Sequence, residues 1–148
     1  MTVRQALLGA CACALTLALA VTSGDAQADE KQADSCLRTK IWDGYGEGWA
    51  VRTATSATLE QGAHRVYLVT LYAGNEYKLQ VCGDDKSTNI DLILHDTEGN
   101  EVARDDSTDR EPLVLYKPSS TETYYVVMYA AGVAEGQSSG MAMAVTYR

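Results

Sequence analysis

The chain has 148 residues, of which 46% are hydrophobic and 22% are charged. This composition is typical of a single globular domain and excludes a collagen-like, coiled-coil or disordered chain. Twenty acidic and twelve basic residues give a formal net charge of −8. Nucleic acid and anionic membrane surfaces would repel such a chain, so neither is expected as a partner.

The first 28 residues are typical of an export signal. Residues 1–5 carry one arginine, an apolar run follows over residues 6–21, and a short polar stretch ends in Ala-Gln-Ala at 26–28. This order predicts a signal peptide that is cleaved after Ala28. The apolar run falls short of the roughly 20 residues that span a bilayer. A lipid-anchoring site at Cys11 is an alternative, but cleavage there would leave most of the apolar run in place. We expect a periplasmic or secreted protein that does not span the membrane.

Two cysteines, Cys36 and Cys82, remain after the predicted cleavage. A single pair in an exported chain predicts an intramolecular disulfide. The bond would close a loop of about 47 residues, which the loop-entropy model equates with roughly 4 kcal/mol of stability. A metal-binding or reactive thiol pair is the alternative, but the sequence has neither a C-x-x-C motif nor a nearby histidine cluster.

The segment 29–49 is predicted to be an N-terminal tail or loop that this disulfide tethers. Three glycines lie within five residues at 44–48, and glycine is unfavourable inside a helix. The segment also holds both tryptophans, Trp42 and Trp49. We expect these two rings to cover an edge of the core.

From residue 50 onward, apolar and polar residues alternate with a period of two, which indicates half-buried strands. The clearest case is Tyr77, Leu79 and Val81, which alternate with polar residues. Turn signals separate about eight such runs at spacings of roughly 8–12 residues, and no segment has a convincing helical period. The prediction for residues 50–148 is an all-β fold, an antiparallel β-sandwich or jelly roll of about eight strands.

The segment 62–129 resembles the bacterial pre-peptidase C-terminal domain. The features that match are a strand and turn at 67–74, a strand at 77–81, Ile-Asp-Leu-Ile-Leu at 90–94, a turn at 96–100, an acidic pair at 105–106, and Thr-Tyr-Tyr-Val-Val at 123–127. The chain departs from the family pattern at Asn89, where aspartate is common, and before the tyrosine pair, where glycine is usual.

This resemblance implies an eight-stranded, jelly-roll-like sandwich without catalytic activity. Such domains usually accompany secreted proteases and other exported proteins, whereas here we expect a free-standing small protein. Some members bind polysaccharide or collagen, and some relatives carry calcium.

The segment 84–111 holds ten acidic and three basic residues, so it accounts for −7 of the net charge. Three interpretations stay open: a solvated acidic face, a calcium site, and a docking surface for a basic protein. Calcium takes six to eight oxygen ligands, and two loops that met at one end of the sandwich could supply them. The candidate ligands are Asp84, Asp85, Asp105, Asp106 and Asp109.

The chain has nine tyrosines and no phenylalanine. One face of the strand that contains Tyr125 and Tyr129 must carry phenol rings toward the surface, where they could stack on sugars or anchor a protein. These two tyrosines are the candidate binding surface. The alternative is that the rings lie in the core with their hydroxyl groups at its rim.

Catalysis is not expected. Only His64 and His95 could act as bases near neutral pH, and neither G-x-S-x-G nor H-E-x-x-H occurs. The prediction is a non-enzymatic binding or accessory module of the bacterial envelope that binds protein, polysaccharide or calcium through its loops. The alternative is an inhibitor or regulator of a basic secreted enzyme, a lysozyme or a protease, with the acidic stretch supplying the attraction.

Overall fold

The structure is a computed structural model that describes residues 28–148; the predicted export signal lies outside these residues except for Ala28. One helix and eight strands follow one another along the described chain. They are α1 (Glu30–Gly46), β1 (Ala50–Glu60), β2 (His64–Leu71), β3 (Tyr77–Gly83), β4 (Ser87–His95), β5 (Glu101–Asp105), β6 (Leu113–Tyr116), β7 (Glu122–Val133) and β8 (Ser138–Tyr147). Over the described range, no helix is long and apolar enough to cross a membrane.

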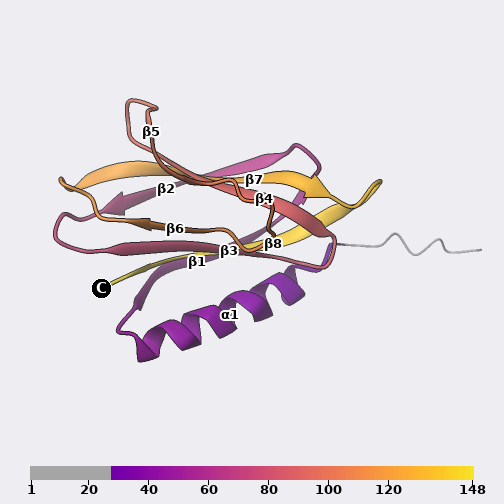
Figure 1. The fold of residues 1–148 in the computed structure, drawn as a ribbon, viewed down its shortest axis with the longest axis horizontal. Helices are drawn as coiled ribbons and strands as arrows, with labels where there is room; N and C mark the ends of the chain where they lie inside the picture. The colour runs from indigo at the N-terminus through magenta and orange to yellow at the C-terminus, as the bar shows by residue number, and fades with distance from the viewer. Residues whose placement is uncertain (1–27) are drawn as a thin grey trace, which may run out of the picture.

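The strands form two four-stranded sheets, ordered β1-β8-β3-β6 and β2-β7-β4-β5. Every neighbouring pair is antiparallel. Figure 1 shows the two sheets stacked as layers, with α1 lying along the outside of the sheet that contains β1 and β3. The predicted all-β sandwich of about eight antiparallel strands is confirmed.

The core lies between the sheets and follows the period of two seen in the sequence. Tyr77, Leu79 and Val81 of β3 are at most 1% exposed, and they face Ile90 and Leu92 of the other sheet within one hydrophobic cluster. Side chains that alternate in this way bury one face of each sheet against the other. The other face of each sheet stays available for the helix or for the surface.

The prediction of a loop at 29–49 is wrong, because residues 30–46 form α1. The carboxylate of Asp29 caps the helix by accepting a hydrogen bond from the Gln32 N–H at 3.0 Å, and Glu30 adds negative charge to the first turn. The glycines lie at the end of the helix and do not interrupt it. Gly48 has a φ of 87°, a conformation that glycine adopts at little cost, and it turns the chain into β1.

The helix packs on the outer face of its sheet, and the predicted disulfide between Cys36 and Cys82 is present. This bond confirms that the N-terminal segment is tethered to β3. The apolar contact beneath the helix is small, since it consists mainly of Ala33 and Leu37 against the alanines of β8. At the start of the helix the backbone passes so close to Gly140 that a Cβ there would lie 2.5 Å from the Glu30 nitrogen.

Candidate interaction surface

The carboxylate of Asp84 is a structural anchor. Asp84 is fully buried, and its two oxygens accept hydrogen bonds from four donors. The backbone N–H groups of Asp29 and Gly140 donate at 2.8 Å, the Ser139 hydroxyl donates at 2.8 Å, and the Lys86 N–H donates at 3.0 Å. These bonds join the start of α1, the start of β8 and the β3–β4 turn. Burial alone would raise the pKa of Asp84, but the four hydrogen bonds outweigh it and hold the pKa below its ordinary value.

These four hydrogen bonds argue against the predicted role of Asp84 as a calcium ligand. A carboxylate has about four lone-pair sites, and here the protein's own donors fill them. The two loops of the proposed site do meet, but through Arg110, whose guanidinium donates to the Asp84 carbonyl at 3.1 Å. Asp85 is exposed on the β3–β4 turn and pairs with Lys86 at 2.7 Å.

The other three candidate ligands have separate local partners. Asp105 accepts from Ser107 and from the Leu113 N–H, Asp106 pairs with Arg104, and Asp109 accepts from the Glu111 N–H. Within residues 28–148, only one group of three potential metal-ligand residues has its ligand atoms within 4.8 Å of one another. This group is Cys36, Cys82 and Glu111, and its two cysteines are already bonded together. Calcium binding at the remaining aspartates stays a prediction, which a calcium titration of the melting temperature would test.

Most of the acidic stretch gathers on one side of the sandwich. We call this side the acidic edge and define it as β5 and β6 with the loops 96–100 and 106–112. It holds seven acidic residues and two basic ones. The acidic residues are Asp96, Glu98, Glu101, Asp105, Asp106, Asp109 and Glu111. Both β5 and β6 are the last strands of their sheets, so this side is an open edge of the sandwich.

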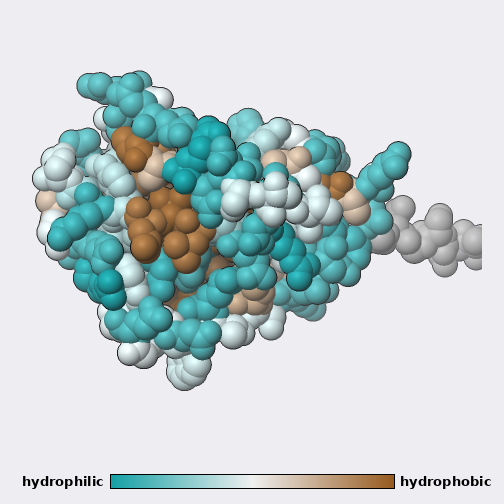
Figure 2. Space-filling view, in the orientation of Figure 1, coloured by the Kyte–Doolittle hydropathy of each residue, from teal (hydrophilic) through white to brown (hydrophobic). Residues whose placement is uncertain are grey.

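Two exposed leucines lie within the acidic edge. Leu113 and Leu115 of β6 are 43% and 54% exposed, while Val114 between them is 3% exposed and packs into the core. In Figure 2 a hydrophobic patch appears at the position of β6 and is bordered by hydrophilic surface. An apolar centre within a charged rim is the usual composition of a protein-binding surface.

Hydrogen bonds fix the backbone that carries these groups. The Leu113 N–H donates to the Asp105 carboxylate at 2.8 Å, which links β6 to β5 of the other sheet. Burial tends to raise the pKa of Asp105, but the bonds from Ser107 and Leu113 dominate and keep it below its ordinary value. Lys40 of α1 pairs with Glu111 at 2.8 Å and holds the loop 106–112 against the helix. The edge is therefore a structured surface that is negatively charged at neutral pH.

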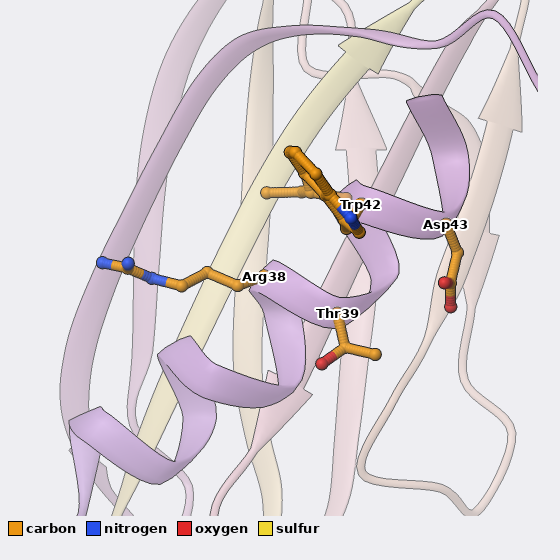
Figure 3. A pocket seen from close by; sticks show the side chains of 5 residues that line it. Arg38, Thr39, Trp42 and Asp43 are labelled. Carbon is orange, nitrogen blue, oxygen red and sulfur yellow. The ribbon is translucent and has the colours of Figure 1, made fainter. Parts of the chain in front are cut away.

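The helix carries a second surface that the sequence did not reveal. Trp49 is buried as expected, but Trp42 is 76% exposed and its ring contacts Tyr45 edge-on, with centroids 5.7 Å apart. Figure 3 shows Trp42 standing out from α1, with Arg38 extending away from it and Thr39 on another side of the helix. The expectation that both tryptophans cover the core edge is therefore wrong for Trp42.

The two candidate tyrosines lie on the outer face of the β2-β7-β4-β5 sheet. Tyr125 and Tyr129 are half-buried, whereas Tyr124 between the sheets is 3% exposed. Tyr125 is paired across the ladder with Leu68 of β2, which is 68% exposed. This tyrosine face lies on the opposite sheet from α1. Sugar or protein binding there stays a prediction.

The fold and these surfaces define a small all-β sandwich protein with an acidic open edge and a disulfide-tethered helix on one sheet. No protein-family model and no curated protein matches the chain. Among solved structures, the chain is similar to PliG of Aeromonas hydrophila, a periplasmic inhibitor of g-type lysozyme. The TM-score is 0.52 at 13% identity, and the match covers 67% of this chain and 88% of that chain.

At this identity, the likeness to PliG shows the sandwich fold and leaves the function open. The resemblance of residues 62–129 to the pre-peptidase C-terminal domain stays a prediction, because no family model supports or opposes it.

Proposed function

We propose that this protein is exported and binds a cationic secreted enzyme, such as a lysozyme, as its inhibitor or regulator. The observation that carries the proposal is the acidic edge, which combines seven acidic residues with the exposed leucines of β6. Such a surface has the complementary charge for a basic protein. The role is non-enzymatic, because an inhibitor needs only to occupy the enzyme's surface.

Charge and apolar contact would contribute differently to this complex. Opposite charges accelerate encounter and orient the partners over about one Debye length, roughly 8 Å at physiological salt. The side chains of Leu113 and Leu115 would then lose water against the enzyme, which slows dissociation. The complex should therefore form more slowly at high salt while keeping part of its affinity.

Two further findings support the proposal. The protein shares its fold with a periplasmic inhibitor of g-type lysozyme, which makes an inhibitor a better-supported interpretation than a general envelope module. The disulfide between Cys36 and Cys82 favours an oxidising compartment such as the periplasm or the exterior of the cell.

Neutralising the acidic edge is expected to weaken binding to a cationic g-type lysozyme by about tenfold or more. The test variant combines Glu98→Gln, Asp106→Asn and Asp109→Asn, all at exposed positions. The matched control removes three exposed carboxylates outside the edge, by Asp43→Asn, Glu60→Gln and Glu135→Gln. The dissociation constant is measured for both variants by calorimetry at low and high salt.

The two variants carry the same net charge, so they separate a local surface from a general charge effect. The proposal requires the edge variant to bind weakly and the control to stay within about twofold of the unmodified protein. Equal loss in both variants, or no binding by the unmodified protein, would contradict it.

A further inference from the structure

A cavity opens between β1 and β2, on the side of the sandwich opposite the acidic edge. These two strands are the end strands of their sheets, just as β5 and β6 are on the other side. The cavity has a volume of about 280 Å³. Its floor is formed by the core side chains of Val126, Met143 and Val145, and Thr53, Thr55 and Tyr67 line its sides.

The lining suits an aliphatic ligand. The floor side chains carry no hydrogen-bonding N–H or O–H group, so a polar group placed there would lose its hydrogen bonds to water without replacement. The hydroxyl-bearing side chains of Thr53, Thr55 and Tyr67 lie at the sides of the cavity. Small-molecule sites usually have volumes of roughly 300–1,000 Å³, and an apolar cavity of roughly 150 Å³ can already hold a benzene ring. Because stacked sheets lie about 10 Å apart, a space between them favours a flexible chain over a broad ring system.

A cation, Arg52, lies in a hollow that adjoins this cavity. A second hollow, lined by Arg52, Thr53, Leu68, Val69 and Thr70, shares three of these residues with the cavity. Arg52 occupies an irregularity in the β1–β8 ladder, since Val51 pairs with Thr146 and Thr53 with Val145. A bulge of this kind redirects a side chain away from the regular pattern.

The surroundings of Arg52 leave its charge available. Its guanidinium carbon lies 5.0 Å from the centroid of the Tyr72 ring, which holds the side chain by a cation–π contact. Within the described part of the chain, Arg52 makes no ion pair. An arginine in this position can form a charge-assisted hydrogen bond with a carboxylate or a phosphate.

We propose that this cavity binds an aliphatic chain with an anionic head group. The chain occupies the space between the sheets, and the head group contacts the guanidinium of Arg52. Free fatty acids and single-chain phospholipids share this chemistry. The site is separate from the acidic edge and does not depend on the proposed enzyme partner.

The test measures binding of ten-carbon ligands to the purified protein by calorimetry, below their micelle-forming concentrations. Decanoate and a decanoyl lysophosphatidate carry the two anionic heads, decanol carries none, and decyltrimethylammonium carries the opposite charge. Either anionic ligand should bind more tightly than decanol, and the tighter of the two indicates the natural source. The ammonium ligand should bind most weakly because Arg52 would repel its head.

Two variants separate the head-group contact from the cavity. Arg52→Gln should weaken decanoate binding about tenfold and remove its advantage over decanol. Arg65→Gln is the control, because Arg65 is exposed on β2 and does not line the cavity. Thr55→Leu should fill the cavity, so that binding of every ligand falls at least about tenfold while the melting temperature stays the same or rises.

The proposal is overturned if no anionic ligand binds at about 1 mM. It is also overturned if Thr55→Leu binds decanoate as well as the unmodified protein, since the chain would then lie elsewhere. If Arg52→Gln and Arg65→Gln weakened decanoate binding equally, the loss would reflect the change in net charge and not a contact between Arg52 and the head group.

Discussion

Replacing both Cys36 and Cys82 by alanine is expected to lower the free energy of unfolding by about 4 kcal/mol. The disulfide joins residues 46 positions apart, so its loss frees a long loop in the unfolded chain. For a domain of this size the melting temperature should fall by roughly 15 °C. Urea unfolding followed by circular dichroism measures the change.

Loss of the disulfide should destabilise α1 more than the strands, because the apolar contact under the helix is limited to Ala33, Leu37 and a few small neighbours. Hydrogen exchange of the α1 amides should therefore accelerate more than that of β3. Reduction of the unmodified protein provides an independent comparison and should reproduce the loss. A change below about 1 kcal/mol would show that packing alone holds the helix in place.

Asp84→Asn is expected to lower the free energy of unfolding by about 2–3 kcal/mol. The amide keeps one acceptor oxygen, so it can satisfy the Asp29 and Gly140 N–H groups that now share one carboxylate oxygen. Its NH₂ group would then face the Lys86 N–H, which would be left without an acceptor. Asp85→Asn is the matched control and should change stability by less than about 0.5 kcal/mol, because Asp85 is exposed.

The pKa of Asp84 predicts the pH dependence of this effect. Its folded-state pKa lies below the ordinary value of 3.8, so the folded protein binds fewer protons than the unfolded chain near that pH. The stability that the carboxylate contributes is fully present above pH 3.8 and is lost as the pH falls through the folded pKa. The difference between the unmodified protein and Asp84→Asn should therefore shrink in acid. A difference that stayed constant from about pH 7 to about pH 2 would contradict this role.

The strands were predictable because burial on one face of a sheet imposes a period of two on the sequence. Tyr77, Leu79 and Val81 show that period, and the structure buries all three. The helix was not predictable from the same signal, because only a few of its residues are buried and its contact with the sheet is made by small side chains. The Asp29 cap and the position of the glycines at the helix end were the local signals that could have identified it.

The candidate site was only partly predictable. A cluster of charged residues can be recognised in the sequence, but contacts between residues far apart in the chain cannot. The concentration of acidic residues in 84–111 is visible in the amino-acid sequence and identifies the charged region. The sequence does not show that Asp84 meets Asp29 and Gly140, which lie 55 and 56 residues away in the chain. The sequence also does not show that Leu113 and Leu115 lie on the surface. Their exposure becomes clear from the structure, where β6 pairs only with β3 and is the last strand of its sheet.

The two open sides of the sandwich have different chemistry. One carries the acidic edge with its exposed leucines, and the other carries the apolar cavity beside Arg52. An enzyme bound at β5 and β6 would leave the entrance between β1 and β2 free. Binding of decanoate and binding of lysozyme should therefore be independent.

The most direct test of the acidic edge as an enzyme-binding surface is the residual activity of a purified cationic g-type lysozyme on bacterial cell walls, titrated with this protein at low salt. We predict that activity falls steeply as the protein approaches the enzyme in concentration, and that the edge variant with Glu98→Gln, Asp106→Asn and Asp109→Asn inhibits much less. Full enzyme activity at a large excess of the unmodified protein would contradict the account.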